Sequence, residues 1–387
     1  MDKIADAFSL IRNGANIKQG LDDSGYPITR IETISNRTVD RDKMGYAGIT
    51  DITKYSDYVL QDGDILMSHI NSETHLGKVA RYEKYEGETI IHGMNLLCLR
   101  PNKNLVDSRY AFYYLSSEAF LHQIPRITKK SVNQASFNVA ALKELTFPIS
   151  SMEVQQPVAD ILDKANELIA LRKEQLAKLD ELVKARFVEM FGDGNHPHIA
   201  LIDLIIEGAG LSYGIVQPGD DGTGDMGVLR PVDMVDGKIS TASIKYIDRS
   251  IGDGFKKTEL YGDELLITVR GTTGTTALTD IRFNGMNVTR GIAVVRYDRN
   301  KINPVYLNAY LNTDESQRYI QEHTRGATLQ QINLSDLRVQ QIMVPPLALQ
   351  EQMAAFIEQT DKSKVAVQKA LDEAQLLFDS LMQKYFG

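Results

Sequence analysis

The 387-residue sequence contains one cysteine, Cys98, so no disulfide can form within the chain. Cys98 lies in the apolar run Leu96–Leu99, where we expect a small core residue. Scarce cysteine is typical of proteins in a reducing cytosol. No uncharged apolar run of about 18 residues occurs, and Met1–Asp6 has no apolar signal core. The sequence therefore predicts a cytoplasmic protein that does not enter a membrane.

The sequence also has no excess of basic residues. Its 51 Asp and Glu outnumber 43 Lys and Arg, which gives a net charge of −8. This balance argues weakly against nucleic-acid binding, because phosphate contacts come from clustered Lys and Arg. Net charge reports on solubility more than on local patches, however, so it does not exclude a DNA-binding surface.

The motifs of DNA-modifying enzymes are missing too. Gly222–Gly227 has the spacing G-x-G-x-x-G, but it leads from a loop into an expected strand, which favours a glycine-rich turn over a nucleotide site. Gly77-Lys78 and Gly237-Lys238 lack the earlier glycine of a phosphate loop, and no Asn-Pro-Pro-Tyr-like run could hold a flipped adenine. Asp236-Gly-Lys238 has no suitably spaced acidic partner of a nuclease, and a turn is the better interpretation. We predict no catalytic residue and no cofactor site.

The histidines do not predict a metal site. His69 and His75 could share a metal, but the lone cysteine and the lack of a nearby carboxylate pair make this weak. The chain contains an internal repeat, described below, in which Val269 and Thr275 occupy the places of His69 and His75. Neither residue is a metal ligand of the histidine type. His196-Pro-His198 is interpreted as an exposed linker.

The most informative feature is an internal repeat of roughly 195 residues. Tyr26–Ile34 aligns with Met226–Met234, and Gly63–Ser68 aligns with Asp263–Thr268. Further landmarks then recur in the same order: an apolar strand-like run, a tyrosine pair, a proline, a glutamine pair and a long helical stretch that ends in Phe-Gly. These are Leu96–Arg100 and Ile292–Arg296, Tyr110 and Tyr114 with Tyr306 and Tyr310, Pro148 and Pro345-Pro346, Gln155-Gln156 and Gln350-Glu-Gln352, and Phe191-Gly192 and Phe386-Gly387.

Each repeat is expected to hold a compact α+β domain followed by a long helix. The domains are placed at 1–150 and 193–349, and the helices at 151–192 and 350–387. Short β-patterned runs such as Tyr58–Leu60, Ile65–Met67 and Leu96–Leu99 are bounded by turn residues. A helix is expected at Ser108–Gln123 in the first domain, and its counterpart at Pro304–Glu322 in the second.

The long helical stretches carry apolar residues at alternating steps of four and three. This period favours a coiled-coil seam between the two helices, each of about 35 residues and roughly 50 Å long at about 1.5 Å per residue. The alternative is that each helix packs onto its own domain. The stripes are Leu162, Ala165, Ile169, Leu176, Leu179, Val183 and Met190, interrupted by Arg172 and Arg186, and Met353, Ile357, Val367, Leu371, Ala374, Phe378, Leu381 and Tyr385, interrupted by Thr360 and Lys364.

Two polar loops in each domain are the candidate DNA-reading segments. Arginine suits guanine, amides suit adenine, and hydroxyls and lysine suit phosphates or mixed contacts. For any single residue the alternative is an ordinary solvated turn. The candidates in the first domain are Ser68, His69, Asn71, Ser72, His75, Lys78, Arg126, Lys129, Lys130, Asn133 and Gln134. Those in the second domain are Thr268, Arg270, Thr272, Thr273, Thr275, Arg325, Gln330 and Gln331.

With these features, the whole chain resembles the specificity subunits of type I restriction–modification systems. The matching features are the duplication, the Asp263–Leu266 strand, the loop Thr324-Arg-Gly326 and the segment Pro345–Gln352 that opens the last helix. The first repeat departs from this pattern, because Lys129-Lys130 replaces the Arg-Gly pair and Val154-Gln-Gln-Pro157 lacks the glutamate.

The resemblance implies two target-recognition domains related by pseudo-two-fold symmetry and separated by two antiparallel coiled-coil helices. Each domain would read one half of a split site in double-stranded DNA, while the helices set the unread gap. The partners would be two DNA adenine methyltransferase subunits and a motor–nuclease subunit, which would hold the S-adenosylmethionine, ATP and Mg²⁺.

Three alternatives stay open at this point. The chain could serve a stand-alone DNA methyltransferase, without a nuclease. It could be a self-sufficient DNA-modifying enzyme, which the missing motifs disfavour. It could also be a coiled-coil adaptor with lectin-like or peptide-binding heads, which would show no dependence on DNA.

Overall fold

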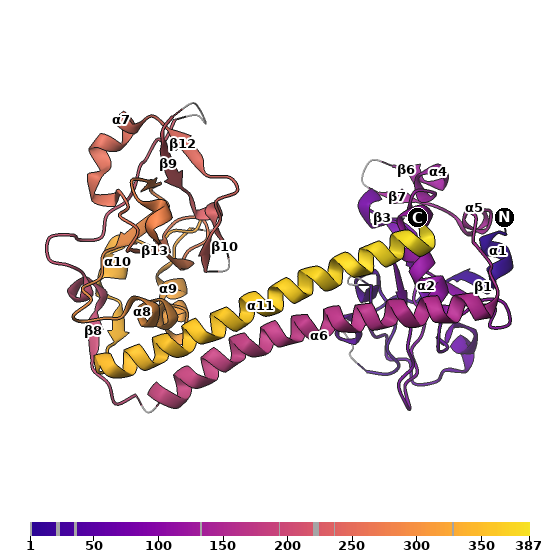
Figure 1. The fold of residues 1–387 in the computed structure, drawn as a ribbon. Coiled ribbons are helices and arrows are strands. Elements are labelled where there is room, and N and C mark those ends of the chain that lie inside the picture. The colour runs from indigo at the N-terminus through magenta and orange to yellow at the C-terminus, as the bar shows by residue number, and fades with distance from the viewer. Residues whose placement is uncertain are drawn as a thin grey trace. The chain divides into compact units, whose positions relative to one another are not determined.

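The computed structural model describes residues 2–20, 24–34, 37–131, 134–192, 194–219, 224–235, 237–326 and 329–387. The chain divides into two compact units. The first unit comprises Met1–Glu174 together with Gln368–Gly387, and the second comprises Gln175–Val367. Each unit therefore contains one α+β domain and parts of both long helices (Figure 1).

An antiparallel sheet with two covered faces forms the centre of the first unit. Its order is β1-β5-β2-β4, and side chains alternate between the faces along each strand. Ile65 and Leu97 enter the larger core, which packs on helix α2, whereas Leu66 and Cys98 enter a second, smaller core. The bounds in this domain are α1 Ile4–Ala7, β1 Phe8–Asn13, β2 Ile65–Ser68, β3 Ile70–Asn71, β4 Val79–Arg81, β5 Leu96–Pro101, α2 Ser108–Ser116, α3 Glu118–Leu121, α4 Ile124–Ile127, β6 Lys129–Lys130, β7 Ala135–Ser136 and α5 Val139–Lys143.

The second unit repeats this design around the sheet β14-β13-β16. Leu265 and Ile267 of β13 enter the larger core, and Leu266 between them enters a separate one. The expected α+β domains are thus confirmed. The bounds are β8 His198–Ala200, β9 Met226–Leu229, β10 Met234–Val235, β11 Lys238–Ile239, β12 Lys245–Ile247, α7 Arg249–Gly252, β13 Leu265–Thr268, β14 Thr276–Leu278, β15 Asn287–Val288, β16 Ile292–Val295, α8 Pro304–Leu311, α9 Asp314–His323, α10 Leu334–Val339 and β17 Gln341–Met343.

The two long helices are α6 (Met152–Phe191) and α11 (Leu347–Phe386), each of 40 residues; α6 lies within its expected range, and α11 begins three residues before its expected start. They pack together and run antiparallel (Figure 1). In the first unit Leu162 shares a core with Leu381 and Tyr385, which lie near the opposite end of their helix. In the second unit Lys364 Nζ lies 2.7 Å from Asp180 Oδ1. The predicted seam is confirmed: its positions are buried or half-buried, including the interrupting Arg172, Thr360 and Lys364.

Three details of the expected secondary structure are wrong. The helix expected at Ser108–Gln123 breaks at Ser117, whose hydroxyl accepts a hydrogen bond from the Phe120 N–H and starts a new helix. Thr313 interrupts Pro304–Glu322 in the same way. Tyr58–Leu60 is not a strand: a 3₁₀ helix runs through Tyr58, and Val59 forms one isolated bridge with Ile91.

The segment His196-Pro-His198 is also more structured than a linker. His198 begins strand β8, which pairs antiparallel with β17, and the ring of His196 packs edge-on against Phe191 at 5.8 Å. Separately, among the described residues no helix is long and apolar enough to cross a membrane.

Candidate nucleic-acid interface

The two candidate loops of the first domain meet in a small sheet of order β3-β7-β6. Ile70 and Lys129 both pair with Ser136, and Asn71 and Lys130 both pair with Ala135. The Phe137 N–H also donates to His69 O at 3.1 Å. Residues 68–78 and the described part of 126–136 therefore form one surface, which we call the first paired-loop surface.

The second domain builds the same arrangement from a different sequence. Gln331 bridges to Arg270 and to Arg325, and the Gly271 N–H donates to Gln330 O at 2.9 Å. The hydroxyls of Thr273 and Thr324 lie 3.0 Å apart. Residues 268–275 and 324–331, in their described part, form the second paired-loop surface.

Many of the predicted side chains on these surfaces are accessible. Those exposed are Ser72, His75, Arg126, Lys129, Lys130, Gln134, Thr272, Arg325 and Gln330, and those half-buried are Asn71, Lys78, Arg270, Thr275 and Gln331. Asn133 lies outside the described residues. Accessible Lys, Arg and amide groups can donate to phosphate oxygens and base edges.

Four predicted residues are instead buried beneath the surfaces. Ser68, His69, Thr268 and Thr273 are 2%, 6%, 0% and 7% exposed. Thr268 Oγ1 accepts from the Thr275 N–H at 2.9 Å and so holds its turn. The His69 ring packs edge-on against Phe137, and burial lowers the pKa of His69, which favours the neutral ring. In this conformation these side chains support the loops.

Local polar contacts position several exposed side chains. In the first domain Ser72 Oγ lies 2.9 Å from His75 Nδ1, and Lys130 Nζ lies 2.7 Å from Glu73 Oε1. The ion pair is exposed, so it contributes little to stability and leaves the ammonium accessible. In the second domain Arg325 Nη2 lies 3.8 Å from Asp336 Oδ2.

Sequence reasoning missed the residues that join the two loops of each domain. Ser136 pairs with both loops in the first domain, and Thr324 contacts Thr273 in the second. Gln317 of α9 donates to Gly274 O at 3.0 Å and ties the helix to the loop. No periodic signal marks these residues, because the pairing joins segments that are far apart in sequence.

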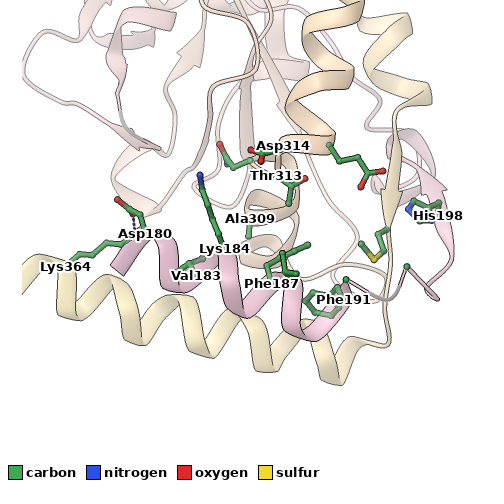
Figure 2. Close-up of a pocket in the computed structure, with 16 residues that line it drawn as sticks. Asp180, Val183, Lys184, Phe187, Phe191, His198, Ala309, Thr313, Asp314 and Lys364 are labelled. Carbon is green, nitrogen blue, oxygen red and sulfur yellow. Dashed lines mark ion pairs between the residues drawn. The ribbon is translucent and has the colours of Figure 1, made fainter. Parts of the chain in front are cut away.

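A separate cleft lies in the second unit, where the end of α6 meets α8 and the start of α9. Its volume is about 990 Å³. Phe187 and Phe191 form its apolar floor and pack on Tyr306 at ring distances of 5.8 and 5.3 Å. Figure 2 shows Lys184 rising from α6 on the side where Asp314 lies. The lining of this cleft thus combines aromatic rings with charged side chains.

Comparison with known proteins agrees with this architecture. The family model described as type I restriction modification DNA specificity domain matches residues 2–181 and 225–374. The MjaX type I restriction enzyme specificity subunit of Methanocaldococcus jannaschii is 31% identical over 386 residues, covering 95% of this chain and 89% of that protein. The EcoBI specificity subunit of Escherichia coli is 25% identical over 180 residues, covering 46% of this chain and 38% of that protein.

Two solved structures share the fold. The S subunit of a type I restriction–modification system from M. genitalium has a TM-score of 0.57 and 16% identity, covering 100% of this chain and 95% of that one. A chain from a solved type I restriction–modification system has a TM-score of 0.55 and 14% identity, covering 99% and 96%. With the family model matching most of the chain, this protein belongs to the type I restriction–modification specificity family and is a non-catalytic DNA specificity subunit.

Proposed function

We propose that each paired-loop surface reads one half of a bipartite site in double-stranded DNA. The observation that carries this proposal is the duplication itself: the same composite surface occurs once in each unit, built on equivalent strand pairings. The polar groups on the two surfaces differ, so the two half-sites are expected to differ in sequence. Two linked readers bind most tightly when both half-sites lie at the matching separation.

The chemistry of the exposed side chains supports this division of work. In the first unit Asn71 and Gln134 can pair with adenine, while Arg126, Lys129 and Lys130 can contact phosphates. In the second unit arginines and the amides of Gln330 and Gln331 offer donors to base edges. The mild overall acidity fits a subunit whose partners supply part of the phosphate-binding charge.

We assign the long helices two further roles: setting the gap between half-sites, and docking two DNA adenine methyltransferase subunits, to which a motor–nuclease subunit is added for cleavage. Helix α6 carries apolar residues outside the seam, with Val154, Ile161 and Leu168 52%, 41% and 44% exposed. They are spaced seven residues apart, so they lie on one face. An exposed apolar stripe on a helix is typical of a surface that a partner covers.

Methylation mapping with domain exchange tests the reading role. The chain is expressed with its methyltransferase, methylated adenines are mapped across a genome, and residues 1–150 are then replaced by the corresponding domain of a relative. One half of the recognised site should change while the other half stays the same. A change in both halves, or in neither, would contradict the proposal.

The docking role is tested on the helix face. Leu168→Glu places a charge in the exposed stripe and should weaken capture of the methyltransferase at least tenfold. The matched control is Val232→Glu, which adds the same charge at a residue that is 71% exposed and lies outside the two long helices. If both variants capture the methyltransferase equally well, the exposed stripe of α6 is not part of the docking interface. Adding the motor–nuclease subunit then shows whether the assembly cleaves as well as methylates.

A further inference from the structure

The dipeptide Arg-Gly occurs three times in the sequence, always in the second unit. The pairs are Arg270-Gly271, Arg290-Gly291 and Arg325-Gly326. The first and third lie in the second paired-loop surface. Arg290 lies in the turn between β15 and β16, outside both paired loops.

Backbone contacts bring the three pairs together. The Val269 N–H donates to Gly291 O at 2.8 Å, and Gln331 exchanges hydrogen bonds with Arg325 at 2.8 and 2.9 Å. Gln331 also forms a bridge with Arg270. Gly291 is required here, because a Cβ at that position would lie 2.6 Å from the Pro231 ring. The turn that carries Arg290 thus adjoins the two loops of the second paired-loop surface. We call these three segments together the arginine platform, or the platform.

Arg270 and Arg290 on this platform are not neutralised by a carboxylate of any described residue, unlike Arg230, Arg282 and Arg299 of the same unit. Arg230 lies 3.0 Å from a carboxylate oxygen of Asp233, and Arg282 and Arg299 lie 2.6 Å from those of Asp280 and Asp263. In contrast, Arg270 and Arg290 have no side-chain hydrogen bond or ion pair within the part of the chain that the structure describes.

One donor on the platform is buried as well as unpaired. Arg270 Nε is buried and has no partner among the described residues. Leaving a buried charged donor unpaired is costly, so such groups usually have a partner when the protein functions. Arg325 is 74% exposed, and its closest carboxylate oxygen is 3.8 Å away. The platform therefore brings together two arginines without a side-chain partner among the described residues, Arg270 and Arg290, and the exposed, loosely paired Arg325.

The first unit lacks this feature at the equivalent positions. The Ile70–Ser136 pairing corresponds to the Arg270–Gln331 bridge, and Lys129 takes the place of Arg325. The parallel bridge between Ala15 and Gly93 corresponds to that between Ile215 and Thr289, which places Met94 opposite Arg290. A lysine is a point charge, whereas a guanidinium is a planar fork that matches guanine O6 and N7.

We propose that Arg290 joins Arg270 and Arg325 in reading guanine, so that the half-site of the second unit contains G·C pairs in contact with these arginines. The inference rests on the proposed function, in which each domain reads one half-site. Arg290 is then a specificity-determining residue on a third loop of the interface.

The test uses the chain bound to its methyltransferase and measures binding to the mapped site and to sites with single base-pair changes in either half. Arg290→Met installs the residue found at the equivalent place in the first unit. It should lower discrimination at one G·C pair of the second half-site about tenfold and leave the first half-site unaffected. Arg290→Lys keeps the charge but loses the fork, and should lose the same discrimination.

The matched control is Arg282→Met, which removes an arginine already neutralised by Asp280 and should leave discrimination unchanged. Thermal unfolding of the three variants checks that the second domain remains folded. Two results overturn the inference: a second half-site without G·C pairs, or Arg290→Lys behaving as wild type while Arg290→Met weakens binding to all sequences equally, which indicates a phosphate contact. Either result leaves bipartite reading intact, which the domain exchange tests independently.

Discussion

At the scale of single residues, one buried glutamine in each unit makes the same set of hydrogen bonds. Gln155 Oε1 accepts from the Asp107 N–H at 2.9 Å, and its Nε2 donates to Leu105 O and Ser150 O at 2.8 and 2.7 Å. Gln350 makes the equivalent bonds to Asn303 N–H, Lys301 O and Pro345 O. Asp107 and Asn303 cap α2 and α8, so each glutamine joins the start of a long helix to a domain helix.

Removing one of these glutamines should destabilise its unit. Gln155→Ala would leave one backbone N–H and two carbonyls without partners, at a cost of about 3 kcal/mol in the free energy of unfolding. The neighbouring Gln156 is exposed and provides the matched control, Gln156→Ala, which should cost less than about 0.5 kcal/mol. Urea-induced unfolding of both variants gives the comparison. Equal stabilities would show that these buried hydrogen bonds contribute little.

Buried His92 should make the first unit sensitive to mild acid. Its ring is 2% exposed and its Nε2 donates to Leu96 O at 3.0 Å, and burial lowers the pKa of His92 to about 4. As the pH falls below 6.5 the unfolded chain binds a proton that the folded chain does not, so stability is lost between about pH 6.5 and 4. From pH 7 to pH 5 we expect a loss of about 2 kcal/mol from His92.

The variant His92→Gln can keep a donor for Leu96 O but does not ionise. Its unfolding free energy should therefore fall less between pH 7 and pH 5 than that of the wild type. His69, whose pKa burial also lowers, contributes in the same direction in both proteins. An identical fall in variant and wild type would show that His92 is not the group responsible.

At the scale of elements, helices and strands with a periodic or repeated sequence pattern were predictable. Contacts between segments that lie far apart in the sequence were not. The α6 and α11 seams were predictable because one apolar spacing runs along each helix, and strands β2 and β5 stand out as short apolar runs. Residue type alone did not show that Thr268 faces inward, nor that Ser117 caps a new helix. His198 belongs to a strand because of a partner, β17, that lies far along the chain.

The Phe-Gly ends of the long helices were predicted, but their packing on the domains was not. Phe386, in the last turn of α11, is 6% exposed and packs on Tyr110 and Tyr114 of the first domain at ring distances of 5.1 and 5.9 Å. Phe191, at the end of α6, packs on Tyr306 of the second domain. The phenylalanine of each repeated Phe-Gly pair is thus the residue with which a long helix packs on a domain.

Shortening this docking residue should loosen the first unit. Phe386→Ala removes a buried ring and should cost about 3 kcal/mol, whereas Leu377→Ala on the same helix, at a residue 50% exposed, should cost less than about 1 kcal/mol. Hydrogen exchange resolves the two units, and faster exchange is expected in α2 but not in α8. Equal protection of α2 in both variants would count against this role of Phe386.

At the scale of the whole molecule, neither repeat makes a unit from its own residues. The first unit needs Gln368–Gly387 from the end of the chain, and the second needs Gln175–Phe191 from the first repeat. A repeat expressed alone would expose the surface that the other repeat's helix covers. The division falls within both helices, between Glu174 and Gln175 in α6 and between Val367 and Gln368 in α11.

These two points are where the proposed spacer role can be tested. Inserting seven residues at both keeps the heptad seam in register and lengthens each helix by about 10 Å at ~1.5 Å per residue. If the helices set the gap, the unread segment should grow by about three base pairs at ~3.4 Å each, with both half-sites unchanged. The same insertion in α6 alone leaves its seam without partners and should abolish specific methylation. If the gap is unchanged after the paired insertion, helix length does not determine the spacing between the two half-sites, and the proposed spacer role is wrong.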